Sequence, residues 1–229
     1  MAFLIPGAAG RVARAAPNAA QAPDPPPVAA ARAKVEPAKG DAKPASARWY
    51  DLSTVKKVLH VGDSEVGYAA GLCKDMRARF EAEHVEYHSD AWTSAGLKTV
   101  ADEDKLDKYL VKYDPDLVLL NLGTNNLGFP NAAALAPLVK KVAAKMGQRR
   151  CVWIGPPHLP SGEKTEAAVV KVLAENSSPC RFFDSQALDL SLQPDKIHPD
   201  GRGAQRWAAN LWPVLFEGKE MPGPFRPLK

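Results

Sequence analysis

Residues 55–72 read VKKVLHVGDSEVGYAAGL, and this stretch indicates the class of fold. A strand-like segment at 55–61 runs directly into Gly62-Asp63-Ser64, and a helix-like stretch follows. Open α/β sheets place reactive and ligand-binding groups in such turns, at the carboxyl ends of parallel strands. Ser64 is therefore a candidate nucleophile. The alternative is that Ser64 only caps the following helix, a position that serine favours.

After Trp49 the chain alternates between strand-like and helix-like segments. Strands are expected at 55–61, 84–89, 115–123, 150–157 and 180–184. Helices are expected at 65–83, 102–112, 131–146, 162–175 and 200–217. Strands separated by helices indicate βαβ units with right-handed crossovers. The sequence thus predicts an α/β fold, a three-layer α/β/α sandwich with a central parallel sheet of about five strands.

The composition divides the 229-residue chain into one folded domain and two tails. Residues 1–48 are rich in Ala and Pro and lack apolar periodicity, which predicts a disordered tail or linker. Residues 49–218 form the expected domain, and residues 219–229 form a C-terminal tail. The first 48 residues hold seven Lys/Arg against three Asp/Glu, so the net charge of +4 belongs to them. The remainder is charge-balanced, so nothing in it suggests a surface that binds nucleic acid.

The beginning of the chain bears on its localisation. The start, MAFLIPGAAGRVARAAPNAA, is a poor signal peptide, because its apolar run is short, is interrupted by Pro6 and lacks an early basic region. An Ala/Pro linker behind a weakly hydrophobic start is nevertheless common in exported bacterial proteins. We therefore expect a periplasmic or extracellular protein, with a cytoplasmic one as the alternative. No stretch approaches 18 uninterrupted apolar residues, so no membrane span is expected.

The three cysteines, Cys73, Cys151 and Cys180, do not have the spacing of a zinc site. Cys151 and Cys180 open the fourth and fifth expected strands, and both should lie at the edge of the sheet opposite Ser64. We expect two buried free thiols there. The alternative is a disulfide, which would be compatible with export.

Polar residues follow four of the expected strands at the point where each strand ends. They are Gly62-Asp63-Ser64, the loop 89–96 that ends in Gly96, the segment 121–126 with Asn125 and Asn126, and the segment 195–199 with Asp195 and His198. Parallel topology would bring all four segments to the same edge of the sheet.

A serine at this edge needs a base, because its hydroxyl is a weak nucleophile at neutral pH. His198 can accept the proton, and Asp195, three residues earlier, can hold the Nδ1–H of His198. The backbone amides of Ser64 and Gly96 and the side-chain amide of Asn125 can stabilise an oxyanion.

Four blocks, Gly62-Asp63-Ser64, Gly96, Gly123-Thr124-Asn125 and Asp195-Lys196-Ile197-His198, together resemble the blocks of the SGNH (GDSL-like) hydrolase superfamily. The resemblance covers roughly residues 55–217. It implies a flavodoxin-like fold, with Ser64 as nucleophile, His198 as general base and Asp195 as the orienting acid. It also implies Gly96 and Asn125 as oxyanion donors beside the Ser64 amide. Glu65 departs from the pattern, since an apolar residue is common after the serine.

Four further residues are candidates for substrate binding: Asp63, Trp92, Asn126 and His158. Trp92 could stack on a sugar, or it could be a packed anchor of its loop. Asn126 could contact substrate, or it could serve only in a turn. His158 ends the fourth expected strand and could line the pocket. Asp63 is also expected to hydrogen-bond a neighbouring loop.

These features predict a serine esterase that hydrolyses short acyl esters through an acyl-enzyme, with no metal and no organic cofactor. The resemblance makes O-acetyl groups on carbohydrate or cell-wall polysaccharide a reasonable substrate. Two alternatives remain: an O-acetyltransferase that uses the same triad, and a catalytically silent carbohydrate-binding module. The expected partner is a small-molecule or polysaccharide acyl ester.

Overall fold

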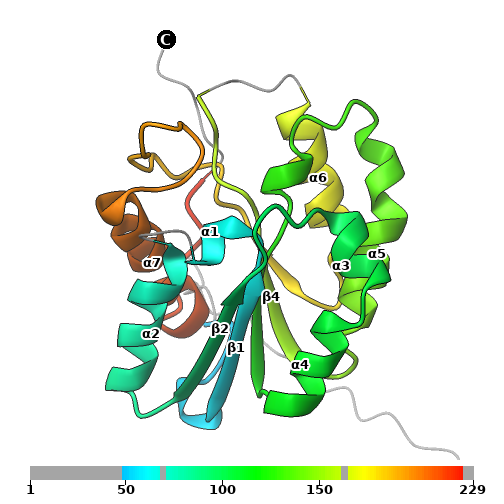
Figure 1. The fold of residues 1–229 in the computed structure, drawn as a ribbon. Coiled ribbons are helices and arrows are strands. Elements are labelled where there is room, and N and C mark those ends of the chain that lie inside the picture. Colours follow the sequence, from blue (N-terminus) through cyan, green and yellow to red (C-terminus); the bar gives the residue numbers. More distant parts are fainter. Residues whose placement is uncertain (1–47, 68–70, 161–164, 224–229) are drawn as a thin grey trace, which may run out of the picture. The chain divides into compact units, whose positions relative to one another are not determined.

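The computed structural model describes residues 48–67, 71–160 and 165–223. Its sheet has five parallel strands in the order β2-β1-β3-β4-β5. The strands are β1 (Lys57–Gly62), β2 (Glu86–Ala91), β3 (Leu117–Asn121), β4 (Arg150–Ile154) and β5 (Arg181–Phe183). This is the order of flavodoxin-like sheets, and it confirms the predicted α/β/α architecture (Figure 1).

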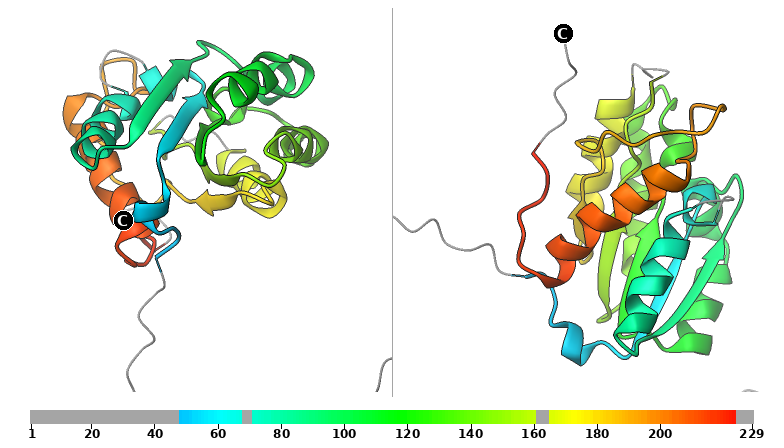
Figure 2. Two further views of the ribbon diagram at one scale, coloured as in Figure 1. Left: turned by 90° about the horizontal axis from the view of Figure 1, so that it is seen from below. Right: turned by 90° about the vertical axis from the view of Figure 1, so that its left-hand side faces the viewer.

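Helices cover both faces of the sheet, with α2 and α7 on one face and α3 to α6 on the other (Figure 2). The helices are α1 (Ser64–Gly67), α2 (Leu72–Ala82), α3 (Leu97–Asp102), α4 (Lys105–Tyr113), α5 (Ala136–Ala144), α6 (Glu166–Asn176) and α7 (Gly201–Phe216). Short 3-10 turns occur at Leu52–Thr54, Thr124–Asn126 and Ala132–Leu135. No helix in the described residues is long and apolar enough to cross a membrane.

The central strand β3 contributes side chains to both hydrophobic cores. Its five residues are all buried, which explains why the sequence there is a continuous apolar run. Leu117 and Leu119 pack into the core beneath α2 and α7, whereas Val118 and Leu120 pack into the core beneath α3 to α6. Burial of each such side chain contributes about 1.5–3 kcal/mol to the stability of the fold. The burial of β3 on both faces therefore stabilises the centre of the sheet.

The expected helix at 65–83 is divided into α1 and α2, and residues 68–70 lie outside the described part. The backbone leaves the helical conformation at Gly71, whose φ of −64° and ψ of 163° are extended. A Cβ on Gly67 would lie 2.7 Å from the Cβ of Ala91, and a Cβ on Gly71 would lie 2.5 Å from the carbonyl oxygen of Val66. The two glycines therefore allow close packing that one continuous helix of larger residues would not.

Other boundaries also differ from the expectation. The second strand begins at Glu86 and not at residue 84, and the fourth ends at Ile154, just before Gly155 and two prolines. Proline cannot donate a ladder hydrogen bond, which is a reason for the early end. The expected helix at 162–175 is observed from Glu166, and residues 161–164 lie outside the described part. Helix α3 was not expected.

Cys151 and Cys180 form a disulfide, so the expectation of two free thiols is wrong. Cys151 lies at the amino end of β4, and Cys180 directly precedes β5. These strands are paired neighbours, and the two Cα atoms are only 4.6 Å apart. Cys73 remains a free thiol.

Candidate active site

The turn after β1 presents the hydroxyl of Ser64 to a histidine. Ser64 Oγ lies 2.9 Å from Nε2 of His198, which comes from the loop before α7. The capping contact in this turn is made instead by Asp63, whose Oδ1 accepts the backbone N–H of Glu65 at 3.2 Å. Ser64 therefore points toward a base, and the neighbouring carboxylate satisfies the start of α1.

Gly62 permits the close approach of strands on which this turn depends. A Cβ at Gly62 would lie 1.8 Å from the carbonyl oxygen of Asn121 on β3. The backbone N–H of Asp63 donates to that same carbonyl oxygen at 2.9 Å. Any larger residue would push β1 and β3 apart just before Ser64, so glycine is required here.

A single turn carries both His198 and the acid that orients it. Asp195 Oδ2 lies 2.8 Å from His198 Nδ1, and Asp195 Oδ1 accepts the backbone N–H groups of Ile197 and His198 at 2.9 and 3.0 Å. Lys196, in the left-handed region with φ +62°, allows this tight turn. The hydrogen bond from His198, followed by those from the two amides, lowers the pKa of Asp195 to about 2.

Ser64, His198 and Asp195 thus form a continuous hydrogen-bonded relay (Figure 1 shows α1 and the start of α7 at the same end of the sheet). In this arrangement His198 can take a proton at Nε2, while the ionised Asp195 holds the other ring nitrogen protonated. The distances meet the requirement for a nucleophile and its general base.

Asp63 lies fully buried beneath this turn. Its Oδ2 accepts the backbone N–H of Thr124 at 3.3 Å, so the carboxyl joins the loop after β1 to the loop after β3. Burial raises the pKa of Asp63 to about 7, although its hydrogen bonds to backbone amides oppose the rise. A side chain with no exposed surface does not reach substrate in this structure. The geometry gives Asp63 a supporting position and not the substrate contact that the sequence suggested.

Glu65 is the unusual residue of the site. It is 1% exposed, and among the described residues neither oxygen of its carboxyl has a hydrogen-bond partner. Burial raises the pKa of Glu65 well above its usual range, and the nearby carboxyls of Asp63 and Asp195 raise it further. An unpaired buried carboxyl is costly, and protonation is how such a group reduces that cost.

The loops that carry Gly96 and Asn125 are hydrogen-bonded to each other. Asn125 Nδ2 donates to the carbonyl oxygen of Ala95 at 3.1 Å, and Asn126 Oδ1 accepts the backbone N–H of Leu97 at 3.0 Å. Gly96 lies between these two contacts as the N-cap of α3. A side-chain amide has two N–H groups, so Asn125 can make a second donation beyond the one to Ala95.

Trp92 and His158 lie in the loops after β2 and β4, at the same edge of the sheet. Trp92 is 8% exposed, its indole N–H donates to Asp90 at 2.8 Å, and Lys105 Nζ lies 5.2 Å from its ring centroid. Its surroundings are those of a loop anchor. His158 is partly exposed, and its Nδ1 lies 3.1 Å from Oε1 of the buried Glu166.

The sequence analysis missed α3 and the residues that it carries to this edge. Leu97, Val100 and Ala101 have the i, i+3, i+4 spacing that could have predicted the helix, and all three are buried. Among the described residues, no group of three or more His, Cys, Asp or Glu side chains could hold a metal ion.

Comparison with known proteins shows similarity of structure. No family model and no curated protein sequence matches the chain. The structure of TesA is 23% identical, with a TM-score of 0.55, and the match covers 70% of this chain and 98% of TesA. A carbohydrate esterase family 3 protein from Talaromyces cellulolyticus is 18% identical, with a TM-score of 0.56 and coverage of 70% and 96%. An acetyl xylan esterase, AlAXEase, is 15% identical, with a TM-score of 0.54 and coverage of 70% and 100%.

Because the sequence identities are so low, these matches show similarity of fold alone. Another match, 14% identical with a TM-score of 0.56 and coverage of 70% and 99%, is a protein from Desulfitobacterium hafniense described as a lipolytic protein of the G-D-S-L family. The chain therefore has the SGNH (GDSL-like) hydrolase fold, and the fold implied by the four sequence blocks is confirmed.

Proposed function

We propose that this protein is a serine esterase that hydrolyses short acyl esters through an acyl-enzyme. The observation that carries the proposal is the relay of Ser64, His198 and Asp195, with its contacts of 2.9 Å and 2.8 Å. The likeness in fold to solved esterases supports it.

In the first half of the proposed reaction, Ser64 Oγ forms a bond to the carbonyl carbon of the ester while His198 Nε2 takes the hydroxyl proton. The carbonyl oxygen becomes an oxyanion, and the N–H groups of Ser64, Gly96 and Asn125 are the proposed donors to it. The bond to the alcohol oxygen then breaks, and His198 gives its proton to that oxygen. Asp195 stays ionised throughout and stabilises the imidazolium.

In the second half, a water molecule replaces the alcohol. His198 takes a proton from the water as its oxygen bonds the acyl carbon, and the same donors stabilise the second oxyanion. The bond to Ser64 Oγ breaks, the proton returns to Ser64, and the free carboxylic acid leaves. The enzyme returns to its starting state without a net change in protonation.

The proposed substrate is an O-acetyl group on carbohydrate. The solved structures of similar fold include an acetyl xylan esterase and a two-domain esterase active on acetylated mannans. The Cys151–Cys180 disulfide supports an oxidising location, since such bonds persist mainly outside the cytosol. We therefore place the proposed activity in an exported protein.

The proposal is tested by measuring free acetate from acetylated xylo-oligosaccharides and by comparing 4-nitrophenyl acetate, butyrate and octanoate. We expect acetate release, with the shorter esters turned over faster. An unacetylated oligosaccharide is then added as acceptor. Acetyl transfer to it in preference to water would replace the hydrolase by an O-acetyltransferase. No turnover of any ester, with retained polysaccharide binding, would indicate a silent binding module.

A further inference from the structure

A cavity of about 330 Å³ is lined in part by the loop that follows β2 and leads to Gly96, one of the proposed oxyanion donors. One wall is the end of β2 at Ala91 with the loop 92–95 that follows it, and the other walls come from α3, α4 and the short link between them. None of the residues that line the cavity belongs to the proposed triad.

The loop that forms this wall is attached directly to the active site. The backbone N–H of Trp92 donates to the carbonyl oxygen of Gly62 at 2.7 Å, two residues before the nucleophile. The carbonyl oxygen of Ala95 accepts from Asn125, and Gly96 follows at once. A ligand in the cavity therefore lies against the loop that also carries a proposed oxyanion donor.

The lining suits a ring that carries many hydroxyl groups. Thr93, Ser94 and Thr99 are exposed and supply hydroxyls that both donate and accept hydrogen bonds. Val100 and Leu106 are buried and supply an apolar floor. A sugar presents the matching surfaces, with hydroxyls at its edges and C–H groups on its faces.

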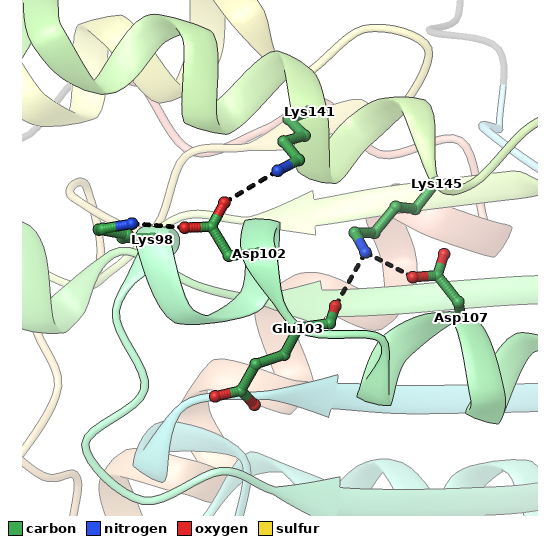
Figure 3. A network of polar contacts seen from close by, with 6 residues as sticks. All are labelled: Lys98, Asp102, Glu103, Asp107, Lys141 and Lys145. Atoms are coloured by element: carbon green, nitrogen blue, oxygen red, sulfur yellow. Dashed lines mark hydrogen bonds and ion pairs between the residues drawn. The ribbon is translucent and has the colours of Figure 1, made fainter. Parts of the chain in front are cut away.

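Glu103 is the acidic residue in the cavity lining, and its carboxylate is a charged hydrogen-bond acceptor. Its backbone carbonyl accepts from Lys145 at 2.9 Å, but its side chain is turned away from that ammonium group (Figure 3). The neighbouring acids differ, because Asp102 and Asp107 are both paired with lysines in the same view. Lys105, the cation of the lining, pairs with Asp90 at 2.9 Å.

We propose that this cavity binds a sugar unit of the acetylated substrate, with Glu103 accepting a hydrogen bond from a sugar hydroxyl. The inference rests on the proposed function, since it identifies the alcohol part of the ester as carbohydrate. Hydrogen bonds to a charged acceptor are the stronger kind, so Glu103 contributes affinity as well as orientation.

The first test measures binding with no catalysis. The full chain carrying Ser64→Ala is titrated calorimetrically with acetylated xylo-oligosaccharides and acetylated manno-oligosaccharides. Thr99→Trp, at an exposed helix position, fills the cavity, and Glu103→Gln removes the charge. Asp104→Asn is the matched control, because this exposed acid is adjacent in sequence, pairs with Lys108 and does not line the cavity.

We expect saturable binding of at least one oligosaccharide, weakened about tenfold or more by Thr99→Trp and by Glu103→Gln and unchanged by Asp104→Asn. Absence of saturable binding with both oligosaccharides would overturn the proposal, and so would equal affinity in the Thr99→Trp variant.

A second measurement separates this inference from the proposed function. These assays use chains with Ser64 intact. Thr99→Trp should raise the KM for the acetylated oligosaccharide more than the KM for 4-nitrophenyl acetate, because 4-nitrophenyl acetate carries no sugar. Asp104→Asn, which lies outside the cavity, should leave both values unchanged. A wild type that binds oligosaccharide but cleaves no ester would refute the esterase and leave the binding site. Unchanged KM for the oligosaccharide, with normal cleavage of 4-nitrophenyl acetate, would refute the binding site alone.

Discussion

Asp195 uses both of its carboxyl oxygens within one turn. One oxygen faces the ring of His198, and the other accepts two backbone N–H groups, so the same residue shapes the turn and orients the ring of His198, the proposed base. Its pKa of about 2 means that the carboxyl of Asp195 is ionised at neutral pH. The charge and the geometry can be separated by a substitution that keeps the shape of the side chain.

Asp195→Asn should therefore lower kcat for 4-nitrophenyl acetate by about 10³–10⁴-fold, because an amide no longer stabilises the imidazolium or the required tautomer. The KM should change little. Steady-state kinetics beside Asp189→Asn, an exposed acid that pairs with Arg206 at 3.4 Å, provides the comparison. A loss smaller than tenfold would show that Asp195 does not orient the base.

The carboxyl of Glu65 differs from that of Asp195, because it is buried and neither of its oxygens has a hydrogen-bond partner among the described residues. Its pKa in the folded chain is raised above the ordinary value of 4.5, so the folded chain keeps a proton that the unfolded chain releases. The contribution of Glu65 to stability is therefore highest below that value and falls as the pH rises toward the folded-state pKa.

Glu65→Leu should raise the free energy of unfolding by about 1–3 kcal/mol, because it removes a buried carboxyl that has no hydrogen-bond partner in the described part of the chain. The gain should be larger at pH 8 than at pH 4, as measured by urea denaturation. Glu65→Gln is the control, since it keeps a polar group but cannot ionise. The same gain at both pH values would contradict the raised pKa.

At the scale of the elements, the Cys151–Cys180 bond joins the amino ends of β4 and β5 across a separation of 29 residues that includes α6. In a parallel sheet these ends lie opposite the carboxyl edge, where Ser64 follows β1. The bond should therefore contribute to stability without affecting the chemistry.

The double substitution Cys151→Ala/Cys180→Ala should lower the free energy of unfolding by about 3–4 kcal/mol, by the entropy of the loop that the bond closes. The kcat for 4-nitrophenyl acetate should not change at temperatures where the variant is folded. Cys73→Ala serves as the control for loss of a thiol. An unchanged unfolding midpoint would mean that the bond does not form in solution.

The elements also show how much of the secondary structure the sequence could predict. The apolar run of β3 predicted a central strand because strands buried on both faces cannot alternate. Gly67 and Gly71 disfavour a continuous helix at 65–83, so the sequence carried a signal for its division. Their close contacts with Ala91 and Val66 exist only after folding and could not be predicted. Helix α3 is only six residues long, but the spacing of Leu97, Val100 and Ala101 could have predicted it.

At the scale of the whole molecule, the fold joins residues that are far apart in the chain. Ser64 and His198 are 134 positions apart, yet their side chains touch. The sequence predicted this because the strand ends of a parallel sheet share one edge. It could not predict the cavity, because three segments and a missed helix form its walls.

Every proposed site residue lies between Asp63 and His198. A shortened chain that begins at Ala42, where the second of two units in the chain begins, should therefore keep the kcat/KM of the full chain for 4-nitrophenyl acetate. Parallel kinetics and unfolding curves of the two proteins check this. A large loss of activity in a shortened chain that is still folded would give the first 41 residues a part in the site.

The most direct test of the proposed esterase is hydrolysis of 4-nitrophenyl acetate by the wild type, Ser64→Ala and His198→Ala. We expect turnover by the wild type and a loss in kcat on the order of 10³-fold or more in each variant, because neither can form the acyl-enzyme by the proposed route. Equal rates in all three proteins would mean that the contact between Ser64 and His198 is structural and that any hydrolysis occurs elsewhere.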